Sequence, residues 1–268
     1  MCINLCTKKK EELIINKEKD IKERMQVMKV PDYTEMSKKA MGVILDRISE
    51  YSDVIIALPT GNTPEMLYSL LVEEHKRGSA DFGDVVVFNL DEYAGLESAD
   101  PNSYYHYINE RFLKHVNIKR SHLLNGMAED LEKECRDYED YIKNEGRIDI
   151  VILGIGRNGH VAFNEPGTSF DSLTHVVELD EDTRKANARF FFNGEEVPRK
   201  ALTMGIKTIM DAREIILMAS GKEKSNAIKE AIKGEITERV PASILQKHKN
   251  CKVIMDGDAG AYLGNRFY

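Results

Sequence analysis

Short, continuous apolar runs alternate with amphipathic segments along most of this chain, and this alternation limits its fold more than any other feature. The runs have the length of strands, and they lack the alternation of apolar and polar residues that is typical of a strand with one solvent-exposed face. Such strands are typical of a mainly parallel sheet that helices cover on both faces. The expected strands are VMKV, DVIIALP, DVVVFNL, IDIVILG, THVVEL, REIILMA and CKVIMD, and the expected helices span 33–50, 64–77, 102–115, 129–145 and 222–233.

The part of the chain that carries this pattern has no visible internal boundary. No repeat, low-complexity segment or Pro/Ser-rich linker interrupts residues 28–260. We therefore expect residues 26–268 to form one domain, an α/β sandwich of three layers with the sheet in the middle.

The first residues differ in composition, since they include the charged run KKKEELIINKEKDIKERM. We expect residues 1–25 to form a charged extension outside the fold. One alternative is that translation begins at Met25 or Met28. Another is a polybasic membrane anchor near Cys2 and Cys6, but acidic residues directly follow the lysines and weaken it.

Composition excludes several classes of protein. The net charge of −7 argues against nucleic acid or an anionic membrane as the main partner. The four cysteines are scattered, which fits a reducing compartment better than a disulfide framework. No apolar run approaches the ~20 residues that span a bilayer, and no secretory leader is visible, so we expect a cytoplasmic protein.

In parallel α/β sheets ligands bind beyond the carboxyl ends of the strands, so the loops there carry the functional information. The first such loop contains Thr60, Gly61, Asn62, Thr63 and Pro64. Thr63 is a good N-cap and Pro64 suits the first helical position. The N–H groups of the helix start and two hydroxyls would form an anion site. The alternative is an ordinary capped helix.

Two adjacent acids, Asp91 and Glu92, follow the next apolar strand without a turn residue between. A carboxylate in a water-poor crevice has a raised pKa and can act as a general base. The alternative is a solvated strand end.

The third loop, LGIGRNGHVAFNEPG, combines glycines with an acid and an imidazole. Gly154, Gly156 and Gly159 would let the backbone approach a ligand. His160 carries the one side chain in this loop whose free pKa lies near neutrality, and Glu165 could orient it or raise its pKa through charge. A metal site would lack a third ligand nearby.

These loops resemble those of the glucosamine-6-phosphate deaminase (isomerase) family. The matching stretches are LPTGNTPEMLY, FNLDEYAGL, DPNSYYHYINERF, LGIGRNGHVAFNEPGTSF, DTRKANARFF and ALTMGI. The resemblance implies a Rossmann-like sheet, no metal or organic cofactor, and conversion of glucosamine 6-phosphate and water into fructose 6-phosphate and ammonium.

The resemblance also implies roles for individual residues. Asp91 would move a proton between C2 and C1 of the sugar, and His160 would open the ring with support from Glu165 and Asn158. The substrate phosphate would be held by Thr60, Gly61, Asn62, Thr63, Arg189 and Lys224.

Two positions depart from the family pattern. Many relatives carry aspartate in place of Asn158, whose amide oxygen could accept from the imidazole N–H but adds no charge. We therefore expect His160 to act as a neutral base with Glu165 as its only anionic partner. Some relatives are hexamers activated by N-acetylglucosamine 6-phosphate through an Arg and a Lys, where this chain has His175 and Val177. We expect no such activation, and a monomer or small homo-oligomer.

Three other functions compete. A galactosamine-6-phosphate deaminase would differ only in its response to the C4 hydroxyl. A 6-phosphogluconolactonase has a similar phosphate loop and the GHxA motif. It lacks the FNEP sequence that contains Glu165 and the DEY carboxylate of Asp91. A sugar-phosphate sensor without catalysis would be expected to lose Asp91 or His160 first.

Overall fold

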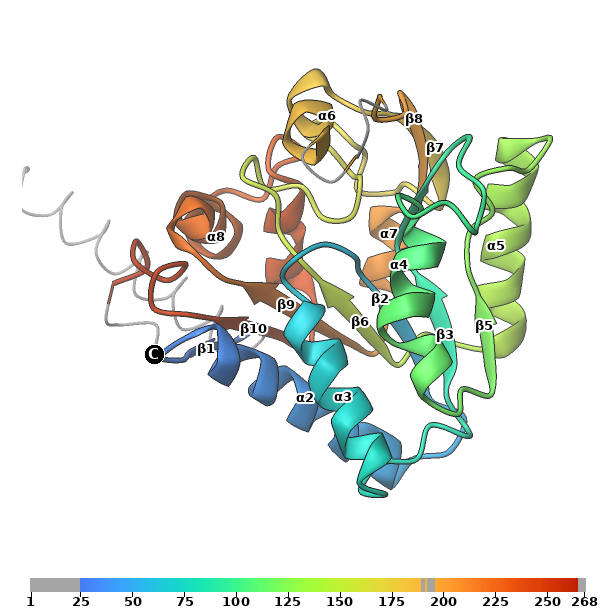
Figure 1. Cartoon of the computed structure of the whole chain (residues 1–268). Coiled ribbons are helices and arrows are strands. Elements are labelled where there is room, and N and C mark those ends of the chain that lie inside the picture. Colours follow the sequence, from blue (N-terminus) through green and yellow to red (C-terminus); the bar gives the residue numbers. More distant parts are fainter. Residues whose placement is uncertain (1–24, 189–190, 192–195, 265–268) are drawn as a thin grey trace, which may run out of the picture.

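A computed structural model describes residues 25–188, 191 and 196–264 of the chain (Figure 1). The charged extension at residues 1–24 lies outside the described residues, as does Arg189. The first strand already begins at Met25, whose side chain is buried, one residue before the domain boundary expected from the sequence.

The centre of the fold is a seven-stranded sheet in which every neighbouring pair is parallel. Its spatial order is β1-β10-β9-β6-β2-β3-β5. The strands are β1 (Met25–Lys29), β2 (Ile55–Leu58), β3 (Val86–Asn89), β5 (Arg120–His122), β6 (Ile150–Leu153), β9 (Glu214–Ala219) and β10 (Cys251–Met255).

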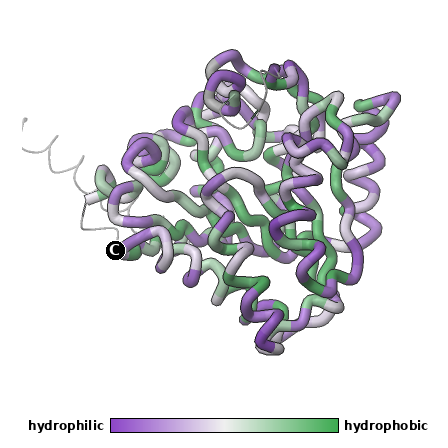
Figure 2. Tube along the Cα trace, viewed as in Figure 1, coloured by the Kyte–Doolittle hydropathy of each residue, from purple (hydrophilic) through white to green (hydrophobic). Residues whose placement is uncertain are grey.

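Helices cover both faces, which confirms the three-layer sandwich (Figure 1). Alternate strand residues point to opposite sides. Ile56 and Leu58 pack with α2 (Tyr33–Glu50), α3 (Glu65–Lys76) and α4 (Tyr104–Arg111). Ala57 packs on the other face, where the helices are α5 (Leu131–Glu145), α7 (Ile206–Met210), α8 (Ser225–Lys233) and η4 (Pro241–Lys247). The apolar tube segments accordingly run through the middle of the molecule (Figure 2).

A second, three-stranded antiparallel sheet has the order β4-β8-β7. It consists of β4 (Asp91–Tyr93), β7 (His175–Glu178) and β8 (Lys200–Thr203), and α6 (Glu181–Asn187) follows β7 along the chain. Strand β4 begins only two residues after the end of β3, so the chain passes almost directly from the large sheet to the small one.

Several details differ from the sequence-based expectation. The run THVVEL forms β7 of the small antiparallel sheet and is not part of the parallel one. The helix expected over 102–115 is divided, because Phe112 leaves helical geometry and a short 3-10 turn, η1 (Leu113–His115), follows. The helix expected from 222 begins with the 3-10 turn η3 (Lys222–Lys224) before α8.

Candidate active site

Four neighbouring strands of the large sheet, in the order β9-β6-β2-β3, bring the predicted site loops together at the carboxyl ends of the strands. Lys224 follows β9, His160 follows β6, the TGNTP loop follows β2, and Asp91 follows β3. From β2 the chain builds outward through β3 and β5, then crosses back to add β6, β9 and β10 on the other side. The site loops thus surround the switch point between β2 and β6, where open α/β sheets bind ligands.

Asp91 is the first residue of β4 and is only 6% exposed, which excludes the alternative of a solvated strand end. Its Oδ1 atom has no hydrogen-bond partner within the described part of the chain. Burial, and secondarily the charge of Glu92, raise the pKa of Asp91 to about 8. An unpaired buried carboxyl is costly to the fold, and such costs are typical of functional sites.

Glu92 is also buried, but its contacts are structural. Its carboxylate accepts from the backbone N–H groups of Tyr93, Tyr104 and Tyr105 at 2.8, 2.9 and 2.7 Å. Burial nevertheless raises its pKa to about 7. The two adjacent acids therefore differ: Glu92 secures the start of α4, while Asp91 has an oxygen left over.

The second acid–base element is the pair formed by His160 and Glu165. Nδ1 of His160 lies 3.2 Å from Oε2 of Glu165. Burial raises the pKa of Glu165, but hydrogen bonds from His160, Thr183 and Asn158 outweigh it, so the net pKa lies below its usual value. With Nδ1–H donated to this carboxylate, Nε2 is the nitrogen that remains for a ligand.

The three glycines of this loop differ in what surrounds them. A Cβ at Gly156 would lie 2.4 Å from Cε1 and Nε2 of His160, so the ring occupies the space that glycine leaves. Gly159 has a φ of 87°, and its Cβ would lie 2.7 Å from Cγ1 of Val240. Of the three predicted approach points, Gly154 alone leaves open space, since a Cβ added there would meet nothing within 4 Å among the described residues.

Asn158 contacts different groups from those expected. Its Nδ2 donates to Oε2 of Glu165 at 2.7 Å, and its Oδ1 accepts from the backbone N–H of His160 at 3.2 Å. The amide therefore fixes the carboxylate, while the imidazole ring contacts Glu165 itself.

The TGNTP loop is held by tyrosines from two helices. The hydroxyl of Tyr107 donates to the carbonyl of Gly61 at 2.6 Å, and that of Tyr33 donates to the carbonyl of Asn62 at 2.8 Å. Thr63 does not cap α3: the N-cap is Pro64, which makes no side-chain capping bond. The Met66 N–H is already bound by the Tyr33 hydroxyl, so the helix start offers fewer N–H groups to an anion than expected.

The loops are linked to each other by side chains. The Tyr104 hydroxyl shares a hydrogen bond with Thr60 and donates to the Tyr93 hydroxyl at 3.2 Å. Thr203 of β8 pairs with Asp91 in the small sheet, and its hydroxyl accepts from the Phe163 N–H at 3.1 Å. Asp91 and the His160 loop are thus both attached to Thr203.

On the other side, the turn before Lys224 is fixed by a carboxylate at the end of β10. Asp256 accepts from the Ser220 hydroxyl at 2.5 Å and from the Gly221 N–H at 3.0 Å.

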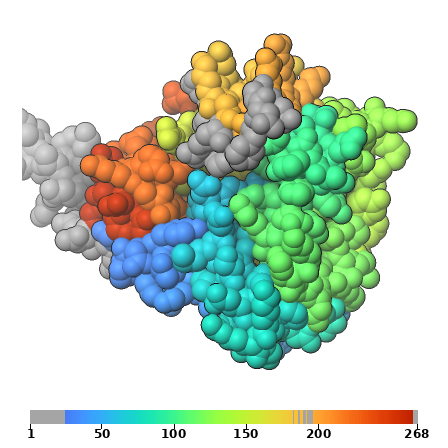
Figure 3. Space-filling model, viewed as in Figure 1, coloured from blue at the N-terminus to red at the C-terminus, as the bar shows by residue number. Residues whose placement is uncertain are grey.

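Two side-chain contacts made by α6 are not predicted by the sequence. The only signal is that both residues lie in the matching stretch DTRKANARFF. Thr183 is 8% exposed and donates to Oε1 of Glu165 at 2.5 Å. Asn187 donates from Nδ2 to the Tyr93 hydroxyl at 2.9 Å. In the space-filling view the yellow atoms of α6 and the orange atoms of β8 lie above the cyan and green atoms of α3 and α4 (Figure 3).

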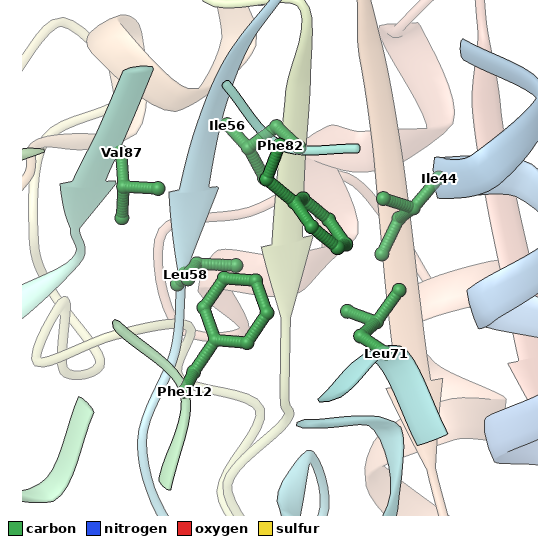
Figure 4. Close-up of a pocket in the computed structure, with 7 residues that line it drawn as sticks. All are labelled: Ile44, Ile56, Leu58, Leu71, Phe82, Val87 and Phe112. Atoms are coloured by element: carbon green, nitrogen blue, oxygen red, sulfur yellow. The ribbon is translucent and has the colours of Figure 1, made fainter. Parts of the chain in front are cut away.

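An internal cavity elsewhere has no comparable chemistry. It lies in the core between the sheet and α2 and α3, and its lining side chains are all hydrocarbon (Figure 4): Ile44, Ile56, Leu58, Leu71, Phe82, Val87 and Phe112. Across residues 25–188, 191 and 196–264, no three His, Cys, Asp or Glu side chains form a group that could hold a metal ion. No helix in these ranges is long and apolar enough to cross a membrane.

Known proteins resemble this chain over most of its length. The family model described as glucosamine-6-phosphate isomerases/6-phosphogluconolactonase matches residues 32–254. Glucosamine-6-phosphate deaminase from Shouchella clausii is 51% identical over 88% of this chain and 97% of its own. Glucosamine-6-phosphate deaminase 1 from Bacillus subtilis is 48% identical over 88% of this chain and 99% of its own.

Solved structures agree with this. A monomeric glucosamine-6-phosphate deaminase, 48% identical, matches with a TM-score of 0.86 over 88% of this chain and 99% of that chain. A 6-phosphogluconolactonase from Trypanosoma cruzi matches with a TM-score of 0.72 at 22% identity, over 90% of this chain and 97% of that chain, which shows a shared fold alone. With the family model and these relatives covering nearly the whole described fold, the chain belongs to the glucosamine-6-phosphate isomerase/6-phosphogluconolactonase family.

Proposed function

We propose that this protein is a glucosamine-6-phosphate deaminase, which converts glucosamine 6-phosphate and water into fructose 6-phosphate and ammonium in amino-sugar catabolism. The deaminases that share about half of its residues support this activity. The observation that carries it in this chain is the buried carboxyl of Asp91, which has an oxygen without a partner among the described residues and stands on the same sheet edge as the His160–Glu165 pair.

In this proposal His160 opens the sugar ring. Nε2 accepts the proton of the O1 hydroxyl as the C1–O5 bond breaks, and returns it to O5. Glu165 holds Nδ1–H and Asn158 holds Glu165, so the ring keeps one tautomer during the transfer.

Asp91 then performs the isomerisation. Its carboxylate removes the proton from C2 and delivers it to C1, while a proton passes from the C2 ammonium group to O1, which leaves a protonated imine at C2 and a hydroxyl at C1. Water adds to the imine and ammonia leaves, so that the ketose is formed.

The raised pKa of Asp91 favours an amino sugar as the substrate. A carboxyl with a pKa of about 8 is mostly protonated at neutral pH. The ammonium group at C2 would stand next to Asp91, and a nearby cation lowers the pKa of a carboxyl. Substrate binding would therefore ionise the base at the moment when it is needed.

The phosphate anchor is proposed at the same end of the sheet, from Thr60, Gly61, Asn62, Thr63 and Lys224. Arg189, which lies outside the described residues, completes the set by resemblance. Binding the remote phosphate would hold C1 and C2 against Asp91, which supplies orientation.

We further propose a single catalytic domain from about Met25 onward, preceded by the charged extension and working in the cytoplasm as a monomer. His175 and Val177 replace the cations that activated relatives use, so its rate curve should be hyperbolic. A sigmoidal curve that N-acetylglucosamine 6-phosphate makes hyperbolic would contradict this.

One assay separates the candidate functions. Purified protein is mixed with glucosamine 6-phosphate, galactosamine 6-phosphate or 6-phosphogluconolactone, and ammonium, ketose phosphate and free acid are measured. We expect ammonium and fructose 6-phosphate from the first in equal amounts. Faster turnover of galactosamine 6-phosphate, or hydrolysis of the lactone alone, would replace the proposal with that function.

A further inference from the structure

Helix α6 contacts the acid–base pair through one buried hydroxyl. Thr183 donates to Oε1 of Glu165 at 2.5 Å, although the two residues come from different parts of the chain. At the other end of the helix Asn187 donates to the Tyr93 hydroxyl at 2.9 Å, so α6 is attached to the site at two points. Residues immediately after this helix include Arg189, a proposed phosphate ligand.

The contacts of Glu165 divide between its two oxygens. Oε1 accepts from Thr183, and Oε2 accepts from Nδ2 of Asn158 and lies 3.2 Å from Nδ1 of His160. A carboxylate held on both oxygens cannot rotate away from the imidazole. Each donor also draws charge from the carboxylate and so weakens its pull on the imidazole proton.

We propose, on the basis of the deaminase function, that Thr183 is a positioning residue whose hydroxyl orients Glu165 toward His160 and connects α6 to the acid–base pair. The hydroxyl touches neither the reacting atoms nor the imidazole, and acts through the carboxylate. Loss of the hydroxyl leaves Oε1 without this donor and the carboxylate more basic, so that the protonated form of His160 becomes more stable.

Among the described residues that contact Glu165 from the neighbouring elements, His160 is the one titratable side chain, since Asn158 and Thr183 are neutral. Glu238, the acid that contacts the end of the same loop, accepts from the Phe170 N–H at 3.2 Å.

Titration of His160 tests the proposal without depending on activity. NMR follows its Cε1–H signal against pH in the unaltered protein, in Thr183→Val and in Thr183→Ser. We expect the Val variant to raise the pKa of His160 by about half a unit to one unit, as loss of a hydrogen bond to a charged group implies. The Ser variant keeps the hydroxyl and should titrate like the unaltered protein.

Thr208→Val is a matched control. Thr208 is 5% exposed and donates to the half-buried carboxylate of Glu139 at 2.7 Å, a threonine–glutamate pair between α7 and α5 outside the site loops. It should lower thermal stability to a similar extent and leave the His160 titration unchanged. If Thr183→Val fails to fold, Thr183→Ala provides the second variant without a hydroxyl.

Kinetics complete the design. The Val variant should lose about threefold to tenfold in kcat at pH 7 with little change in KM, and the Ser variant should recover most of it. An unchanged His160 titration in the hydroxyl-free variants, or an equal shift in Thr208→Val, overturns the role of Thr183. Absence of ammonium release by the unaltered protein sinks the deaminase proposal instead, while the titration still decides the role of Thr183.

Discussion

Two carboxylates at the same edge of the sheet are treated in opposite ways by the fold. Asp91, at the start of β4, is buried with one oxygen unpaired among the described residues, and its pKa is raised to about 8. Glu165, in the loop after β6, has the same exposed fraction but lies less deep below the surface; both of its oxygens have partners, and its pKa is lowered. The depth of burial and the donors around each carboxyl together therefore decide its protonation state.

The difference separates two kinds of work. A carboxyl with an unused oxygen can exchange a proton with a ligand, whereas a carboxylate bound on both sides keeps its charge and holds its neighbour. We therefore propose proton transfer as the role of Asp91 and support of His160 as the role of Glu165.

Replacement of the unpaired carboxyl should have the largest effect. The asparagine in Asp91→Asn is nearly isosteric with aspartate but cannot act as the base. Deaminase kcat should therefore fall by about 10²–10⁴-fold. Equilibrium binding of the sugar phosphate should persist, since the phosphate loop is unaltered. Retention of more than a tenth of the activity would break the assignment of Asp91 as the base.

The same variant should reveal the energetic cost of Asp91 through the pH dependence of stability. The native pKa of about 8 lies above the unfolded value of 3.8, so the unfolded chain loses this proton first as pH rises. Asp91 therefore lowers the free energy of unfolding progressively as pH rises from 4 to 8, and above pH 8 this loss does not grow further. Chemical denaturation should show Asp91→Asn gaining on the unaltered protein by about 2 kcal/mol or more over this range, as each pKa unit contributes about 1.4 kcal/mol.

This gain should be absent near pH 3, where the carboxyl is protonated in both states. A constant difference at every pH would mean that Asp91 titrates normally, and would remove its contrast with Glu165.

A change next to the His160–Glu165 pair should reduce activity less than the loss of the Asp91 carboxyl. In Gly156→Ala the new methyl would lie 2.4 Å from the His160 ring, which must shift from its present position beside Glu165. We expect kcat to fall by about tenfold, with little loss of thermal stability because a side chain can yield where backbone cannot. Gly154→Ala is the control, since nothing lies within 4 Å of its Cβ position among the described residues. Equal losses in both variants would indicate a general effect of the loop.

The smallest effect should come from Asn158→Asp, which removes one of the donors that pair with Glu165. It replaces the Nδ2 donor, 2.7 Å from Oε2 of Glu165, with a second acid. The added negative charge should raise the pKa of the imidazole and shift the acidic limb of kcat/KM upward by about half a pH unit. A profile that superposes on that of the unaltered protein would show that Asn158 does not influence His160.

The layered fold and the site loops are predictable because their signals are local. Buried parallel strands read as uninterrupted apolar runs, and the residues just after them necessarily share one edge of the sheet. Asp91, His160 and the TGNTP loop can be identified in this way. His160 and Glu165 lie in contact, as one of the expected options requires, and the roles given to them stay predictions.

The errors concern contacts between distant segments. Strand β4 has only three residues and exists because β8 pairs with it, so its own sequence carries almost no strand signal. The partners of Asn158 depend on which end of a short amide faces Glu165, and the contact of Thr183 depends on how α6 docks. Neither follows from periodicity or spacing, since polar residues in loops and short helices have many possible partners.

The junction between the two sheets also bears on how the enzyme is made. Asp91 takes its place by pairing with Thr203, which a ribosome adds long after the phosphate loop and the His160 loop have been synthesised. A growing chain that has passed residue 167 holds the sequence of both these loops, but the strand that aligns Asp91 has yet to appear. The strand that holds Asp91 can therefore complete its pairing only after residue 203 has been added, and β9 and β10 of the large sheet follow later still.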